Sequence, residues 1–377
     1  MKKKIRLFKP YLGNEELRSI KKIFKKSWLG IGSEVKKFED HFSKKFKVKY
    51  SLATNSGTSA LNLALKSFNF SKGKIVMVNN MTFAASATCI LNNNLKPLFI
   101  DCEPNNLSFD LEDAKKKITK NVVAIVVVHY GGHPANIREI IKFAKKYKLK
   151  IIEDCAHSQG GSVHGKILGT WGDIGCFSFE EKKGMTTGDG GMIITNKFDT
   201  YKIIKQMRWL GINKGTWERS KSNINLKKNN QHWKYEINIL GDKMHMNDLS
   251  AVIGQEQLKK LNYINYRKQK VVELYRKNII LKNDLKFLIE DYNKSSTYWL
   301  FGLKTKLRDK YIDILKKNGV STGVHHIPLT KFKVFKKYVN RQKTSLKIYN
   351  EILTLPLHAD LNKNDVEYIC KIINKIK

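Results

Sequence analysis

Cysteine and proline are both scarce in this chain, whose 377 residues include five cysteines and six prolines. The cysteines are odd in number, widely spaced and never arranged as Cys-x-x-Cys, which excludes a disulfide framework and a structural zinc site. They are Cys89, Cys102, Cys155, Cys176 and Cys370. With only 24 glycines beside the prolines, a collagen-like or low-complexity chain is excluded as well. We expect reduced thiols in a cytoplasmic protein and no bound metal.

A long apolar run is also missing. No stretch approaches the roughly 18 apolar residues that a membrane-spanning helix needs. The N-terminus is basic but has neither an apolar core nor a small-residue cleavage site, so we expect no secretion signal and no membrane partner. The composition, 41% hydrophobic and 28% charged, suffices for a full core at a length of roughly two domains. Disorder throughout the chain is therefore excluded.

Acidic residues are few: the chain has 33 Asp and Glu and 71 Lys and Arg, which gives a formal charge of +38. Such a charge is typical of proteins that bind nucleic acid. Here the cations follow the polar side of nearly every amphipathic stretch, for example 34–50 and 137–150, and no zinc-finger, basic-zipper or RNA-binding motif accompanies them. We predict no nucleic-acid partner and an attraction for small anions instead.

From about residue 50 to 200, short apolar and β-branched runs alternate with helix-like stretches, which predicts an α/β sheet. The helical patterns cover 57–68, 83–92, 111–118 and 136–147. The predicted strands are 49–54, 74–79, 95–102, 122–130, 150–155, 174–179 and 190–196. The last two are too close for a crossover helix, so we expect them to pair antiparallel in an otherwise mostly parallel, seven-stranded sheet.

A polar, basic stretch at 213–237 interrupts this rhythm, and loops of that length inside compact domains are usually functional or disordered. Residues 247–278 follow as one long helical segment that should lead to a second part of the chain. The remainder mixes short strands with amphipathic helices. We predict a large domain over 1–255 and a small C-terminal α/β domain over 256–377.

Four short segments near predicted strand ends or turns carry the candidate chemistry, since open α/β sheets bind ligands there. Residues 55–61 read Asn-Ser-Gly-Thr-Ser-Ala-Leu at a strand-to-helix junction. Free N–H groups and hydroxyls at a helix N-terminus favour an anion, although Ser and Thr are equally ordinary helix caps. Residues 80–83 place Phe83 just past a strand, where it could be a cofactor platform or a core residue.

The other two segments supply charged side chains. The strand at 151–154 ends in Asp154, which could be a satisfied turn residue or the partner of a cationic ring nitrogen. Residues 177–191 place Lys182 and Lys183 in a Gly- and Thr-rich loop between two apolar strands. Together the four segments offer an anion cradle, an apolar platform, a carboxylate and a lysine. Pyridoxal 5′-phosphate needs one of each, so the sequence predicts a site for this cofactor.

These motifs resemble the DegT/DnrJ/EryC1/StrS family of pyridoxal-phosphate sugar aminotransferases, in the family's order and nearly end to end. The segments that carry the resemblance are SWLGIGSEVKKFEDHF (27–42), NSGTSALNLAL (55–65), IIEDCAHSQG (151–160), FSFEEKKGMTTGDGG (177–191) and VHHIPL (324–329). The resemblance implies the fold type I architecture and a homodimer whose active sites lie at the subunit interface. It also implies a nucleotide-sugar substrate and L-glutamate as the amino donor.

The resemblance also implies roles for individual residues. Lys183 matches the lysine that holds the cofactor covalently, and Asp154 matches the partner of its pyridine nitrogen. His157 occupies the position near the cofactor's O3′, and Phe83 matches the aromatic ring that stacks on the cofactor. The phosphate contacts correspond to Gly57, Thr58, Ser59 and Ser178. His325 lies where members have a substrate-side histidine, with a plain loop histidine as the alternative.

One motif departs from the family pattern. Many members have Gly-Tyr-Asn-x-Arg, which brings the neighbouring subunit's Asn to the phosphate, but this chain has Gly-Asp-Lys-Met-His at 241–245. Lys243 or His245 could replace that contact, because cationic donors suit a phosphate. Arg208 and the cations of 213–237 are candidate clamps for the substrate's diphosphate. We expect the 213–237 stretch to close over the nucleotide or the neighbouring subunit.

The expected reaction is amino-group transfer from L-glutamate to a nucleotide-diphosphate-linked 4-keto-6-deoxyhexose, which gives a 4-amino-4,6-dideoxyhexose. Transfer at C3 of a 3-keto sugar is the alternative within the family. A dehydratase of this family would have histidine in place of Lys183, which argues against that activity. A nucleic-acid-binding or regulatory protein on the same scaffold would need an added basic module, and the sequence contains none.

Overall fold

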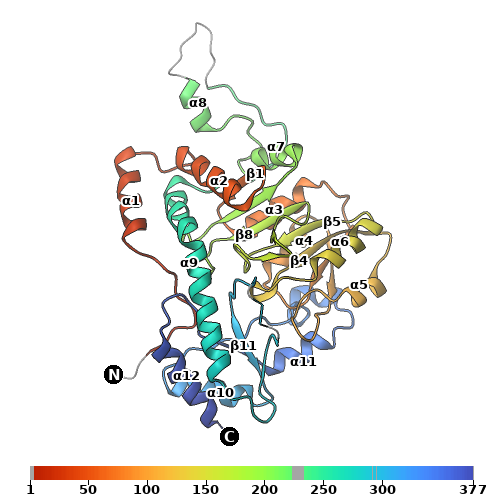
Figure 1. The fold of residues 1–377 in the computed structure, drawn as a ribbon. Coiled ribbons are helices and arrows are strands. Elements are labelled where there is room, and N and C mark those ends of the chain that lie inside the picture. The colour runs from red at the N-terminus through yellow and green to blue at the C-terminus, as the bar shows by residue number, and fades with distance from the viewer. Residues whose placement is uncertain (1–3, 223–232, 291, 294, 377) are drawn as a thin grey trace.

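The computed structural model describes residues 4–222, 233–290, 292–293 and 295–376. At its centre is a seven-stranded sheet in the order β1-β9-β8-β5-β4-β2-β3 (Figure 1). The strands are β1 (Tyr50–Thr54), β2 (Ile75–Asn79), β3 (Lys96–Ile100), β4 (Val122–Val128), β5 (Lys150–Asp154), β8 (Ile174–Ser178) and β9 (Gly191–Thr195). β9 pairs antiparallel with both neighbours, and the other pairs are parallel. The predicted strands and the antiparallel pairing of the last two are confirmed.

Helices cover both faces of this sheet, because successive strand residues point to opposite sides and both sets are apolar. Val76 and Val78 of β2 pack with α3 and α4, whereas Met77 between them packs with α5 and α6. β8 and β9 also pack against α2 and α9 in an aromatic-rich core. The helices of these layers are α2 (Ser33–Phe46), α3 (Gly57–Ser67), α4 (Ala85–Asn92), α5 (Leu111–Lys117), α6 (Ile137–Lys146), α7 (Phe198–Met207) and α9 (Asp248–Asn278).

The long helix α9 runs from the central sheet to the C-terminal part of the chain, and it confirms the helix predicted over 247–278 (Figure 1). The Asn247 side chain accepts a hydrogen bond from the Ser250 N–H and so caps the helix start. Its first half packs on α2 and on α1 (Asn14–Lys26), and its second half joins a separate C-terminal core. The boundary predicted at 255 and 256 falls inside this helix and stays a prediction.

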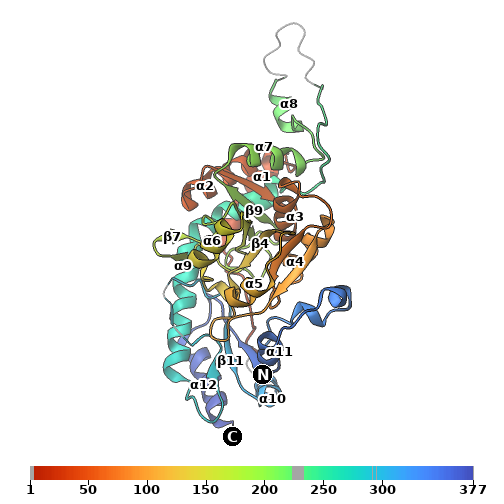
Figure 2. The ribbon, with the colours of Figure 1, turned by 90° about the vertical axis from the view of Figure 1, so that its right-hand side faces the viewer.

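The C-terminal core is formed by a three-stranded antiparallel sheet and its helices, which lie beyond one end of the central sheet (Figure 2). Its elements are β10 (Lys286–Phe287), α10 (Arg308–Lys317), β11 (Phe301–Lys304), α11 (Thr344–Glu351), β12 (Ile352–Leu355) and α12 (Lys363–Lys375). Smaller elements are the hairpin β6 (Ser162–Val163) and β7 (Lys166–Ile167), and the 3₁₀ turns η1 (Tyr130–Gly132), η2 (Leu329–Lys331) and η3 (Lys333–Tyr338). The α/β class predicted for this part is confirmed.

The basic stretch predicted as a loop at 213–237 contains a helix, α8 (Thr216–Ser222), which projects beyond the central sheet domain (Figure 2). Residues 223–232 lie outside the described residues, so the expected closure over a nucleotide or a second subunit stays a prediction. Within the described ranges, no helix is both long enough and apolar enough to cross a membrane.

Candidate active site

Three predicted site segments meet at one edge of the central sheet. β5 ends at Asp154, β8 ends at Ser178, and α3 begins at Gly57 after β1. They open onto a cavity of about 380 Å³. Its walls include Gly57, Thr58, Phe83, Asp154, His157, Ser178, Lys183, Trp299, His325 and His326. Eight of the predicted site residues therefore lie around one cavity, although they are spread over nearly the whole chain.

The start of α3 provides an anion cradle. A Cβ added to Gly57 would lie 2.6 Å from the Ser178 Cβ, so glycine permits the helix N-terminus to approach the end of β8. Among the residues that the structure describes, the N–H groups of Gly57 and Thr58 have no hydrogen-bond acceptor. Ser56 caps the helix by accepting from the Ser59 N–H at 3.1 Å. This leaves two free N–H groups and the Thr58 and Ser178 hydroxyls for a phosphate.

Ser59, also predicted as a phosphate contact, takes part in the cap instead of lining the cavity. Its hydroxyl donates to the Asn55 Oδ1 at 2.6 Å and lies 3.0 Å from the Ser56 Oγ. Ser59 thus holds the turn before α3 in shape, and a direct phosphate contact for this side chain stays a prediction.

Asp154 forms the floor of the cavity with 5% of its surface exposed. Its carboxylate accepts hydrogen bonds from the Ser86 hydroxyl at 2.7 Å and from the Ala156 N–H at 3.1 Å. Burial raises the pKa of Asp154, while these two hydrogen bonds and the positive charge of Lys183 oppose that rise. A protonated ring nitrogen in the cavity would supply the cationic partner that a buried carboxylate requires.

Lys183 lies in the loop between β8 and β9, with its Nζ 4.4 Å from the centre of the Trp299 ring. Burial lowers the pKa of Lys183 to about 8, Glu180 and Asp154 act against this shift, and Lys182 adds to it. A lysine with this pKa is partly neutral near neutral pH, so it can act as a nucleophile and as a base. Lys182 is exposed and its Nζ lies 3.9 Å from the Glu180 carboxylate.

Two residues that the sequence reasoning did not single out hold this loop. The Gln159 Nε2 donates to the Ser178 carbonyl, and its Oε1 accepts from the Met185 N–H at 3.1 Å. The Trp299 Nε1 donates to the Lys182 carbonyl at 2.8 Å. Gln159 belongs to the 151–160 segment, where a polar residue two positions after His157 was a usable signal. Trp299 belongs to the C-terminal part of the chain, and only the tertiary structure brings it here.

Aromatic rings form the side wall of the cavity. The His157 ring stacks on Trp299 with centroids 3.7 Å apart and planes 1° apart. Both ring nitrogens of His157 are buried without a partner among the described residues, and burial lowers its pKa well below the usual value. Phe83 is 60% exposed with its ring 6.2 Å from His326. These rings provide a flat, apolar wall and a neutral imidazole for a planar ligand.

His325 and its neighbour His326 both border the cavity, but their surroundings differ. The His325 Nδ1 lies 3.1 Å from the Thr354 hydroxyl, and burial lowers its pKa to about 4, with Lys183 and Lys182 adding to the shift. The His326 Nε2 is buried and has no partner within the described ranges. The predicted substrate-side histidine therefore has one ring nitrogen beside a hydroxyl, and the unpredicted His326 has a buried ring nitrogen without a partner in the described part of the chain.

The cavity fits pyridoxal phosphate on three independent observations. Among the described residues, the N–H groups of Gly57 and Thr58 have no acceptor, the buried Asp154 has no cation in contact, and His157 has two unpartnered nitrogens. Lys183 borders the same space. These are the features that the phosphate, the ring nitrogen, the ring hydroxyl and the aldehyde of the cofactor need.

Lys243 and His245 do not line this cavity. Lys243 pairs with Trp209 in a β-bridge, and its carbonyl accepts from the Asn55 Nδ2 at 3.3 Å. The His245 ring lies 4.5 Å from the Trp209 ring, and burial lowers its pKa. Both residues lie behind the turn that precedes α3, so a role at the phosphate of a neighbouring subunit stays a prediction.

Arg208, predicted as a substrate clamp, is not brought to the cavity by the structure. It is 4% exposed, and its guanidinium donates to the Glu39 carboxylate and, at 2.8 Å, to the Ala53 carbonyl. A buried guanidinium needs such partners, and here they tie α7 to α2 and β1. In this structure Arg208 is therefore part of a buried ion pair, and its role as a substrate clamp stays a prediction.

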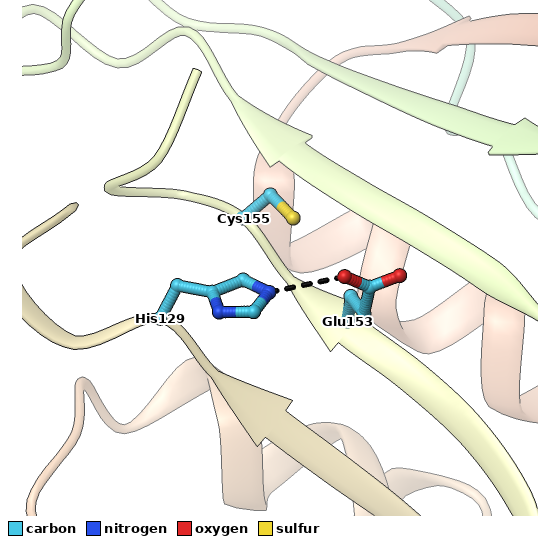
Figure 3. Close-up of side chains that lie close together, drawn as sticks. All are labelled: His129, Glu153 and Cys155. Carbon is cyan, nitrogen blue, oxygen red and sulfur yellow. Dashed lines mark hydrogen bonds and ion pairs between the residues drawn. The ribbon is translucent and has the colours of Figure 1, made fainter. Parts of the chain in front are cut away.

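His129, Glu153 and Cys155 lie close together behind the cavity floor (Figure 3). The Ala135 N–H donates to the His129 Nδ1 at 3.1 Å, so the ring proton is on Nε2, which lies 3.1 Å from Glu153. Glu153 also accepts from three backbone N–H groups, those of Gly169, Trp171 and Gly172. Its oxygens are occupied, so the cluster is a hydrogen-bonded network and not an open ligand set for a metal.

Known proteins resemble this chain over nearly its whole length. Residues 10–374 match the model of the DegT/DnrJ/EryC1/StrS aminotransferase family. GDP-perosamine synthase of Escherichia coli O157:H7 is 30% identical and covers 99% of this chain and 98% of its own. The dTDP-4-dehydro-2,3,6-trideoxy-D-glucose 4-aminotransferase of Saccharopolyspora spinosa is 29% identical over 98% of this chain and 96% of its own.

The fold agrees with these relatives. The crystal structure of the aminotransferase TlmJ from Streptoalloteichus hindustanus superposes with a TM-score of 0.90 at 26% identity, covering 99% of this chain and 98% of the other. The predicted fold type I architecture is thereby confirmed, and so is the cofactor. With its lysine, its carboxylate and its anion cradle around one cavity, the chain belongs to the DegT/DnrJ/EryC1/StrS aminotransferase family and is a pyridoxal-phosphate-dependent sugar aminotransferase.

Proposed function

We propose that the enzyme transfers the amino group of L-glutamate to a nucleotide-diphosphate-linked 4-keto-6-deoxyhexose, giving a 4-amino-4,6-dideoxyhexose. The observation that carries the proposal is the meeting of Lys183 and Asp154 around one cavity at the strand ends. The curated relative named as a 4-aminotransferase of a dTDP-linked 4-dehydro sugar supports the C4 position. The net charge of +38 favours an anionic substrate such as a nucleotide diphosphate.

The chain's own residues have separate tasks in this reaction. When bound, pyridoxal phosphate supplies a ring that withdraws electrons from the donor's α-carbon. Asp154 keeps the ring nitrogen protonated, and the start of α3 with Ser178 holds the phosphate. Lys183, freed by the incoming amine, would take the proton from the donor's α-carbon as a neutral base and return it to the cofactor carbon that had been bound to Lys183. Trp299 and His157 close one wall against water.

We also propose that two copies of the chain form a homodimer with both active sites at the interface. Lys243 and His245 lie behind the α3 turn of their own chain and do not line its cavity. The N–H groups of α3 and the Ser178 hydroxyl are neutral donors to the cofactor's phosphate. A cation of the neighbouring subunit would compensate the negative charge of that phosphate. Cross-linking and sedimentation would test the dimer, and loss of cofactor affinity in Lys243→Ala but not in His245→Ala would select between the two residues.

Transfer at C3 is the second candidate. A relative from Aneurinibacillus thermoaerophilus named dTDP-3-amino-3,6-dideoxy-alpha-D-galactopyranose transaminase is 28% identical over 95% of this chain and 94% of its own. The two positions differ in which ring carbon of the sugar faces Lys183. His326 and Phe83 line the cavity and are candidates for the contacts that orient the sugar.

The test is an assay of the purified enzyme with L-glutamate and a panel of UDP-, dTDP- and GDP-linked 3-keto and 4-keto sugars. We expect amine transfer, detected by mass, to one or more 4-keto sugars. Lys183→Ala should abolish transfer, whereas Lys182→Ala, a change in the exposed neighbouring lysine, should retain it. Transfer to 3-keto sugars alone would favour the second candidate, and no transfer to any sugar would refute both.

A further inference from the structure

A second, much smaller cavity of about 20 Å³ borders the active-site lysine. Lys182, Lys183 and Trp299 line both cavities and so lie between them. The other walls of the small cavity include Phe8, Gly184, Lys268 and His358. A space of this size holds a single oxygen-sized atom, and it lies next to the reacting lysine.

Lys268 of α9 is the unusual member of this wall. It is 5% exposed, and within the described residues its ammonium has neither a hydrogen-bond acceptor nor a carboxylate in contact. A Cβ added to Gly184 would lie 3.7 Å from the Lys268 Nζ, so the amine lies directly beneath the lysine loop. A buried lysine without a partner is costly in its charged form, and burial lowers the pKa of Lys268 to about 7.

The charges around the small cavity favour an anionic occupant. No aspartate or glutamate is among its lining residues. Lys9 and Lys182 have carboxylates nearby, from Asp360 at 2.5 Å and Glu180 at 3.9 Å. His358 is neutral, because burial lowers its pKa to about 4. Lys268 and Lys183 are therefore the lining cations without a contacting carboxylate. An anionic oxygen between them would compensate their positive charge.

We propose that Lys268 binds the side-chain carboxylate of a dicarboxylic amino donor, which rests on the proposed donor, L-glutamate. The donor's nitrogen must exchange with Lys183, and its α-carboxylate stays near that nitrogen in the large cavity. A distal carboxylate on a flexible chain reaches past Lys183, where one of its oxygens meets the Lys268 ammonium. The small cavity would then select dicarboxylic donors over alanine, which lacks the second carboxylate.

The donor half-reaction of the holoenzyme tests this assignment through the visible absorbance of the cofactor. In Lys268→Met we expect the half-saturating concentration of L-glutamate to rise about 10- to 100-fold, because a charged hydrogen bond is lost. The reaction with L-alanine should be unchanged. Lys268→Arg should restore part of the glutamate affinity. Lys270→Met, an exposed lysine on the same helix, is the matched control.

A binding measurement separates this proposal from the proposed function. Glutarate, which cannot react, should raise the melting temperature of the wild-type protein but not that of Lys268→Met, even if no nucleotide sugar accepts an amine. Lys268→Met should fold, because methionine removes an uncompensated buried charge at similar volume. Three results would each overturn the proposal: an unchanged response to glutamate, equal losses with alanine and glutamate, or equal stabilisation by chloride and glutarate, which indicates a site for any small anion.

Discussion

Glu153 and Asp154 are adjacent carboxylates at the end of β5, and their surroundings are opposite. Glu153 accepts hydrogen bonds from three backbone N–H groups and lies 3.1 Å from the His129 ring nitrogen (Figure 3). Together these four groups occupy its acceptor sites. Asp154 accepts from one hydroxyl and one N–H and borders the cavity that contains Lys183. The two neighbouring carboxylates therefore have different roles. A saturated carboxylate stabilises the structure, and one with spare acceptor sites at a cavity can act on a ligand.

The largest expected effect is that of Asp154→Asn. A neutral amide cannot stabilise the protonated ring nitrogen of the cofactor as a negatively charged carboxylate does. We therefore expect the rate of amine transfer to fall by a factor on the order of 10²–10³. The amide oxygen can accept from the Ala156 N–H while the amide NH₂ donates to the Ser86 hydroxyl, which can reverse its role, so the urea unfolding midpoint should change little. Steady-state kinetics and urea unfolding measure the two effects. Near-normal activity in this variant would contradict a role of Asp154 at the cofactor that Glu153 does not have.

Glu153→Gln should show the reverse pattern. In either orientation the amide NH₂ would face two N–H donors, those of Trp171 and Gly172 or those of Gly169 and His129. This leaves buried groups unsatisfied, and we expect a loss of about 2–3 kcal/mol in the free energy of unfolding. The activity of the folded fraction should stay close to wild type. Glu181→Gln, in an exposed glutamate of the lysine loop, is the control. A full loss of activity with unchanged stability would contradict the structural role.

The smallest expected effect is a shift in pH dependence. Only the neutral Lys183 amine attacks the cofactor, so uptake of pyridoxal phosphate by cofactor-free protein should accelerate as the pH rises towards about 8 and level off above it. The negative charge of Asp154 raises the pKa of Lys183, so Asp154→Asn should move the midpoint to lower pH. Glu153→Gln should leave it in place. Stopped-flow absorbance at a series of pH values measures this midpoint. Equal shifts of the midpoint in Asp154→Asn and Glu153→Gln would contradict the different roles of the two carboxylates.

Much of the candidate site was predictable because local patterns mark strand ends. The apolar strand before Asp154 and the Gly- and Thr-rich loop around Lys183 place both residues at the same edge of a parallel sheet. The buried ion pair of Arg208 was not predictable, because its partner Glu39 is 169 positions away in the sequence. No local pattern reveals such a pairing, and an isolated arginine in a basic chain is expected to be exposed.

The sequence by itself determined the order of strands and helices, the segments that supply the cofactor's contacts, and the family. These features depend on periodicity and on short motifs, which are local in the chain. Only the tertiary structure decided that Trp299 stacks on His157, that the His326 Nε2 is buried, and that Lys268 lies beneath Gly184 with no acceptor among the described residues. The reason is physical: burial and the partners of a charge are set by residues from distant parts of the chain, and they decide which of many lysines and histidines can react or bind.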